Sequence, residues 1–133
     1  MIRIAIADDQ VLLRDMMRAM LVSDPEIEVV GCASEGSELI RICLENLPDI
    51  ALVDICMPGT DGIQVLKALK KQAPQIKVIM LTTFEDENNI IEAYQSGTDG
   101  YILKDIRPQA LVLTVKCIYE GLFVMHKKMF INC

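Results

Sequence analysis

Four apolar runs in this chain each end in polar residues, and this pattern restricts the fold more than any other feature. The runs are MIRIAIADD, DIALVD, QIKVIMLT and DGYILK, and they end in Asp8-Asp9, Asp54, Thr82 and Lys104. A short continuous apolar run is typical of a strand buried on both faces, as in a parallel sheet covered by helices. Ligands of such sheets bind beyond the carboxyl ends of the strands. We therefore expect three carboxylates, a hydroxyl and an ammonium to meet at one edge.

Strand and helix patterns alternate from one end of the chain to the other. We predict strands at residues 2–7, 27–33, 49–54, 76–82 and 99–103, and helices at residues 10–22, 36–46, 62–72, 85–96 and 108–120. The helical segments carry apolar residues at helical spacing, and turn residues separate the elements. Since crossovers between parallel strands are right-handed, the pattern predicts an α/β fold. It is a doubly wound, flavodoxin-like (βα)5 parallel sheet with strand order 2-1-3-4-5.

Composition excludes several classes of protein. The chain has 133 residues, 52% of them hydrophobic, which is enough apolar matter for one domain with a full core. Its formal net charge is −6 and it shows no basic patch, so we expect no DNA binding by this chain alone. The sequence shows no apolar stretch long enough to span a membrane and no organisation of a signal peptide. We therefore expect no membrane contact and a cytoplasmic location.

The five cysteines and the single histidine suggest neither a zinc site nor a disulfide framework. The cysteines are odd in number and form no CxxC pair, so we expect them to be small, reduced core residues. We expect His126 to be solvated. The cysteines are Cys32, Cys43, Cys56, Cys117 and Cys133.

Three carboxylates in one crevice repel each other, and a hard divalent cation would remove that repulsion. Mg2+, or Mn2+ in its place, prefers oxygen ligands and keeps several waters. We expect Asp9 and Asp54 to be direct ligands and Asp8 to act through water. The backbone carbonyl of Cys56, two residues after Asp54, is a candidate for a further oxygen ligand.

The same edge is suited to phosphoryl transfer. Asp54 can serve as a nucleophile and form an aspartyl phosphate. The Lys104 ammonium and the Thr82 hydroxyl can then contact the phosphoryl oxygens, because this chemistry needs mainly positioning and neutralisation of charge.

Each of these residues also has an ordinary structural interpretation. A double Asp after a strand is often a helix cap, a Thr at a strand end needs no special role, and a lone Lys is usually solvated. A shared site is favoured because all of them fall at the same end of consecutive strands.

At these residues the chain resembles the receiver domain of bacterial two-component response regulators. The resemblance covers roughly residues 2–121 and rests on IAIADDQ, LVDICMPGTDG, VIMLTTF and GTDGYILKD. The residues of these motifs are most similar to those of the subfamily with a C-terminal helix-turn-helix DNA-binding domain, the LuxR/NarL type. The resemblance implies an acidic pair at Asp8 and Asp9, the phosphoacceptor at Asp54, switch residues at Thr82 and Tyr101, and a phosphate-binding lysine at Lys104.

Three positions near the implied site vary in this family or allow another interpretation. Asp105 follows the lysine, where many receivers have proline. Cys56 and Phe84 occupy the two positions that tune phosphate lifetime in the family. Tyr101 also fits a half-buried aromatic on an edge strand, which is its ordinary structural interpretation.

The resemblance also implies an organisation and partners. We predict a receiver domain at residues 1–121, with residues 122–133 as the start of a linker or a C-terminal tail. A sensor histidine kinase is the implied phosphoryl donor, and transcriptional control is the implied output, through a C-terminal DNA-binding domain if the full-length protein has one. The helix at 108–120 is apolar over more than one face, so we predict a homodimer through the first and last helices, favoured by phosphorylation.

Two other interpretations stay open at this point. One is an aspartyl-phosphate phosphatase of the haloacid-dehalogenase type, although Cys56 stands where that class needs a second aspartate. The other is a receiver-like scaffold that is never phosphorylated. In the leading interpretation the chain is a phosphoacceptor signalling domain and not an enzyme, beyond its self-catalysed phosphoryl transfer and autodephosphorylation.

Overall fold

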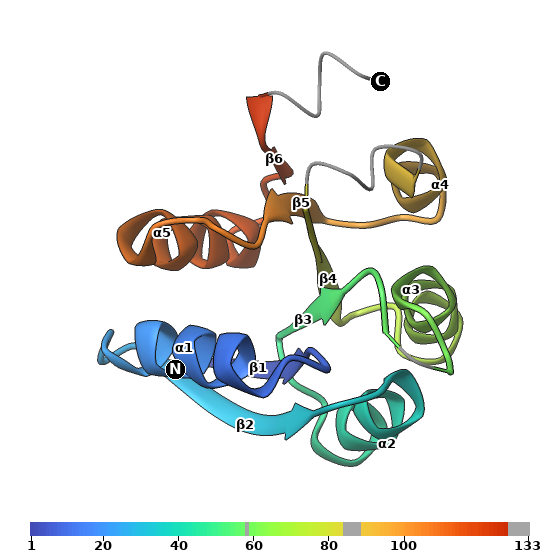
Figure 1. Cartoon of the computed structure of the whole chain (residues 1–133), viewed down its shortest axis with the longest axis horizontal. Coiled ribbons are helices and arrows are strands. Elements are labelled where there is room, and N and C mark those ends of the chain that lie inside the picture. The colour runs from blue at the N-terminus through green and yellow to red at the C-terminus, as the bar shows by residue number, and fades with distance from the viewer. Residues whose placement is uncertain (58, 84–88, 128–133) are drawn as a thin grey trace.

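The computed structural model describes residues 1–57, 59–83 and 89–127, and these form a parallel sheet with helices on both faces (Figure 1). Within the described residues the sheet has six strands in the order β2-β1-β3-β4-β5-β6. The strands are β1 (Ile2–Ala7), β2 (Ile27–Ala33), β3 (Ile50–Asp54), β4 (Lys77–Thr82), β5 (Gly100–Leu103) and β6 (Val124–Met125). The helices are α1 (Val11–Val22), α2 (Gly36–Asn46), α3 (Gly62–Gln72), α4 (Ile90–Gln95) and α5 (Pro108–Tyr119).

The sheet separates two apolar cores, because successive side chains of a strand point to opposite faces. In β1, Ile4 and Ile6 lie in the core beneath α1 and α5, whereas Ala5 and Ala7 lie in the core beneath α2, α3 and α4. Figure 1 shows the two groups of helices on opposite sides of the sheet. The strands β1, β3, β4 and β5 are therefore buried on both faces, as their continuous apolar runs predict, whereas β2 at the sheet edge is mostly half-buried.

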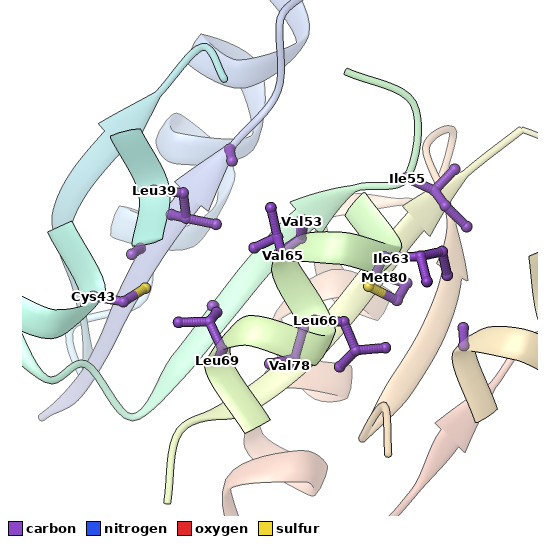
Figure 2. Packing of buried hydrophobic residues seen from close by; sticks show 14 of the residues in the cluster. Leu39, Cys43, Val53, Ile55, Ile63, Val65, Leu66, Leu69, Val78 and Met80 are labelled. Carbon is purple, nitrogen blue, oxygen red and sulfur yellow. The ribbon is translucent and has the colours of Figure 1, made fainter. Parts of the chain in front are cut away.

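Helix α3 shows how the sequence builds one of these layers. Val65, Leu66 and Leu69 follow helical spacing and are fully buried on the sheet (Figure 2). The Asp61 carboxylate accepts the backbone N–H of Gln64 at 2.9 Å, and the Gln64 side chain accepts the N–H of Asp61 at 3.2 Å. This reciprocal cap fixes where α3 begins, directly after the segment that follows β3.

The register aligns the carboxyl ends of four strands. Ala7 of β1 is level with Val53 of β3, and Thr82 of β4 is level with Leu103 of β5. The residues that follow these strands therefore share one edge of the sheet. The predicted doubly wound order 2-1-3-4-5 is confirmed, and β6 extends it beyond β5.

One segment differs from the sequence-based expectation, and another lies partly outside the described residues. The stretch after residue 121, expected to begin a linker or tail, contains β6, which pairs with β5. The helix expected at 85–96 is described only as Ile90–Gln95, because residues 84–88 lie outside the described residues. Within the described part of the chain, no helix is long and apolar enough to cross a lipid bilayer.

The expectation for the cysteines is correct for one residue and wrong for another. Cys43 is buried, and burial raises the pKa of its thiol to about 12. Cys56 is exposed, because it lies in the loop after β3, while Cys32 and Cys117 are half-buried. Cys133 lies outside the described residues.

The sequence predicts a solvated His126, whereas the structure places this residue in a half-buried position. Its backbone N–H donates to the carbonyl of Tyr101, because β6 directly before it pairs with β5.

Candidate functional site

Three aspartates meet at the carboxyl edge of the sheet. Asp8 and Asp9 follow β1 and Asp54 ends β3, and one carboxylate oxygen from each lies within 4.8 Å of the others. Asp8 and Asp54 are 0% and 1% exposed, whereas Asp9 is exposed to solvent. The predicted convergence of the three acids is therefore present.

Lys104 brings a positive charge into this cluster from the end of β5. Its Nζ lies 3.0 Å from Asp54 Oδ1 and 3.4 Å from Asp8 Oδ2. Its backbone N–H donates to the Thr82 carbonyl at 2.8 Å. The backbone of Lys104 is therefore fixed next to Thr82. Its side chain lies in the acidic cluster and is not solvated, as an isolated lysine usually is.

Backbone amides orient the two buried carboxylates. Asp8 Oδ1 accepts the N–H of Gln10 at 2.8 Å, and Asp54 Oδ1 accepts the N–H of Cys56 at 3.1 Å. These short-range bonds fix one oxygen of each carboxylate. The Oδ2 atoms of Asp8 and Asp54 are buried and accept no hydrogen bond from the described residues.

The electrostatics of the cluster favour an additional positive charge. The pKa of Asp54 is raised to about 7, mainly by burial and also by the neighbouring Asp8, against the lowering effect of Lys104 and the Cys56 N–H. Burial lowers the pKa of Lys104, but its contacts with Asp54 and Asp8 outweigh this effect and raise the pKa above its usual value. One ammonium is thus shared between two buried carboxylates, with a third acid beside them.

These residues fit a hard divalent cation. Two buried oxygens without hydrogen bonds and an exposed third carboxylate form the oxygen-rich donor set that Mg2+ prefers. A cavity of about 460 Å³ opens beside the cluster and is lined by Asp9, Ile55, Cys56, Met57, Asp61, Ile63 and Asn89. A cation and its waters therefore have access from solvent.

The other predicted site residues surround the cluster. Thr82 is buried at the end of β4, and its hydroxyl donates to the Thr83 carbonyl at 3.0 Å. Tyr101 is fully buried within β5; it is not a half-buried edge aromatic, because β6 covers the edge of its strand. Phe84 lies outside the described residues.

Sequence reasoning missed two residues that hold the β1–α1 loop. The Arg14 guanidinium donates to the carbonyl of Asp8 at 3.1 Å, and the Gln10 side chain lies 3.5 Å from Lys104 Nζ. Both are polar residues at the start of an amphipathic helix, where a solvated side chain is the usual outcome. The one signal in the sequence that points to a role for Gln10 and Arg14 at the site is their position shortly after the acidic pair Asp8-Asp9.

Comparisons with known proteins agree with this geometry. Residues 4–116 match the family described as response regulator receiver domain. The uncharacterized transcriptional regulatory protein YhcZ of Bacillus subtilis (strain 168) is 41% identical over 112 residues, which is 84% of this chain and 52% of that protein. The chain spans little more than half the length of such curated relatives.

Solved structures show the same likeness. The response regulator ChrA of a heme-sensing two-component system superposes with a TM-score of 0.84 at 35% identity, covering 98% of this chain and 63% of that one. A LuxR-family DNA-binding response regulator from Staphylococcus aureus gives a TM-score of 0.84 at 29% identity, covering 90% and 99%. The haloacid-dehalogenase alternative finds no support among these relatives. The chain belongs to the response regulator receiver domain family, with LuxR/NarL-type regulators among its relatives.

Proposed function

We propose that this chain is a signalling switch in which Asp54 accepts a phosphoryl group from a sensor histidine kinase. The observation that carries the proposal is the buried Asp54 carboxylate, 3.0 Å from the Lys104 ammonium and clustered with Asp8 and Asp9. Because its pKa is about 7 without a cation, Asp54 needs added positive charge to be fully ionised as a nucleophile.

In the transfer step an ionised Asp54 oxygen forms a bond to phosphorus, and the bond from phosphorus to the donor breaks. The electron pair of the broken bond leaves with the donor, a histidine nitrogen of the kinase or the acetate of acetyl phosphate. Lys104 and Thr82 are then placed to contact the phosphoryl oxygens. The hydroxyl of Thr82 would give up its bond to the Thr83 carbonyl to do so.

Mg2+, or Mn2+, would be held by Asp9 and Asp54 directly, by Asp8 through water and by the backbone carbonyl of Cys56. When bound, the cation supplies positive charge that offsets the charge of the carboxylates and of the phosphoryl oxygens. Gln10 keeps Asp8 oriented through its backbone N–H. Cys56, exposed at the rim of the cavity, and Phe84 would tune how fast water removes the phosphate.

The proposed conformational response runs through Thr82 and Tyr101. Movement of Thr82 toward a phosphoryl group on Asp54 favours the inward position of Tyr101, the position in which it is buried here. Phosphorylation would thus shift a population between two packings of the same residues.

The proposed output is transcriptional control through a C-terminal DNA-binding domain of the full-length protein. Relatives such as YhcZ are named transcriptional regulatory proteins and extend well beyond the matched region. The formal net charge of −6 is unfavourable for DNA binding by this chain alone. In this organisation residues 1–121 are the receiver, residues 122–133 lead toward the output domain, and the protein works in the cytoplasm with its kinase.

A homodimer through α1 and α5 is the proposed assembly. The two helices lie side by side on one face of the sheet (Figure 1). Leu12 on α1 and Leu113 on α5 are 81% and 62% exposed, and Met16 is 53% exposed. Large apolar side chains so exposed on neighbouring helices are typical of a contact surface.

Intact-mass analysis after incubation with acetyl phosphate and Mg2+ tests the proposed function. We expect one added phosphoryl group in the wild type and none in Asp54→Asn, in Lys104→Ala or in the presence of a chelator. Continuous hydrolysis of the donor without a stable adduct would point to a phosphatase. No adduct and no hydrolysis would point to a scaffold.

A further inference from the structure

The strand β6 lies directly against Tyr101. Met125 is in register with Tyr101, and Val124 with Gly100. The backbone N–H of His126 donates to the Tyr101 carbonyl at 3.2 Å. Residues 124–126 of the same chain therefore lie along the edge of the strand that carries the proposed switch residue (Figure 1).

The side chains of β6 divide between the two cores. Met125 packs against the core that contains Tyr101, and Val124 packs against the core beneath α1 and α5. Because register partners on neighbouring strands point to the same face, Met125 lies between Tyr101 and the open edge of the sheet. A Tyr101 ring turned outward past this edge would meet Met125. The docked β6 and the buried Tyr101 therefore favour each other.

The attachment of β6 is weak by the usual structural criteria. The strand has two residues, both half-buried, and the bond from the Val124 N–H to the Asp99 carbonyl is long at 3.4 Å. A cavity of about 350 Å³ lies between β6 and the segment that leads into α5, with Ile106 and Thr114 among its lining residues. An element with few bonds and a cavity beside it opens at low free-energy cost, so a small change at Tyr101 can shift its docking.

We propose that β6 is a docking strand whose attachment to β5 is coupled to the position of Tyr101. The inference rests on the proposed phosphorylation of Asp54. Phosphorylation holds Tyr101 inward, which stabilises docked β6, and by thermodynamic reciprocity docked β6 stabilises the phosphorylated state. The signal then leaves the receiver through residues 122–126, whatever follows them.

Amide hydrogen exchange, measured by NMR on the full chain with and without acetyl phosphate and Mg2+, tests this coupling. Intact mass is recorded on the same samples. We expect the His126 amide to exchange at least about fivefold more slowly after phosphorylation, the lower end of typical coupling between sites. The Leu122 amide, which bonds to the Cys117 carbonyl at the end of α5, is the internal control and should not slow.

The outcomes separate the two proposals. A mass gain with slower exchange at His126 supports the coupling. A mass gain with unchanged or faster exchange overturns the coupling and leaves the proposed function intact. No mass gain overturns both.

A matched pair of variants adds a second arm. Met125→Ala removes the cover over Tyr101, and Leu122→Ala removes a side chain of the same segment that is 60% exposed. We expect the phosphorylation-dependent slowing at His126 to be lost in Met125→Ala and kept in Leu122→Ala. Full slowing in Met125→Ala, or equal loss in both variants, would contradict the proposal.

Discussion

At the scale of single residues, Asp54 makes the site depend on pH. Its pKa in the folded chain is about 7, against 3.8 for an ordinary aspartate, so folding favours the protonated form. Relative to the unfolded chain, the burial of this group therefore costs no stability below about pH 4. Its cost grows as pH rises, and it is fully expressed above the folded pKa of about 7.

Asp54→Asn should therefore stabilise the protein in a pH-dependent way when a chelator is present. We expect the difference in unfolding free energy between Asp54→Asn and the wild type to grow by more than about 1 kcal/mol from pH 5 to pH 8, since one pKa unit is worth about 1.4 kcal/mol. Urea unfolding at the two pH values measures it. Parallel pH profiles for the two proteins would show that burial of Asp54 carries no such cost.

Much of the candidate site could be predicted because its acids and its lysine stand at the ends of apolar strands. Asp8, Asp54 and Lys104 are ordinary residues singly, and only the shared edge of a parallel sheet joins them. The contribution of Arg14 to the site could not be predicted. Its guanidinium donates to a backbone carbonyl, and no spacing in the sequence encodes such a contact.

At the scale of elements, α3 approaches the end of β3 so closely that only glycine fits at its start. A Cβ on Gly62 would lie 2.5 Å from the carbonyl oxygen of Asp54 and 2.6 Å from the Cα of Ile55. The carbonyl of Ile55 also accepts the Gly62 N–H at 2.9 Å. The glycine thus lets a helix that packs on the sheet also position the backbone of Asp54, the proposed phosphoacceptor.

Gly62→Ala should impair both stability and phosphorylation. We expect a loss of about 1–3 kcal/mol in unfolding free energy, as for other overpacked sites, and a phosphorylation rate at least about tenfold lower, because the nucleophile is displaced. Gly59→Ala is the control: its φ is 76° but nothing lies within 4 Å of the added Cβ. Equal phosphorylation rates in the two variants would contradict the role assigned to Gly62.

The strand β6 could not be predicted from its own sequence. Two residues carry too little periodicity for a strand assignment, and their conformation depends on the free edge of β5, which is distant in sequence. The full burial of Tyr101 could not be predicted for the same reason, because without β6 its strand would be the edge of the sheet. The pairing of β5 with β6 therefore accounts for both the strand and the burial of Tyr101.

At the scale of the whole molecule, the exposed apolar residues of α1 and α5 predict the state of assembly. Leu113→Asp places a charge in the proposed interface, and Ile91→Asp places one on α4, where Ile91 is 51% exposed. We expect phosphorylated wild type and Ile91→Asp to sediment as dimers and Leu113→Asp as a monomer. A monomeric wild type in both phosphorylation states would exclude the dimer.

Asp54, and no other acid of the cluster, is the residue that we expect to carry the phosphoryl group. Borohydride reduces an aspartyl phosphate to homoserine, which marks the modified position for peptide sequencing by mass spectrometry. After treatment with acetyl phosphate and Mg2+, we predict homoserine at residue 54 and unchanged aspartate at residues 8 and 9. Homoserine at residue 8 or 9, or at none of the three positions, would show that Asp54 is not the phosphoacceptor.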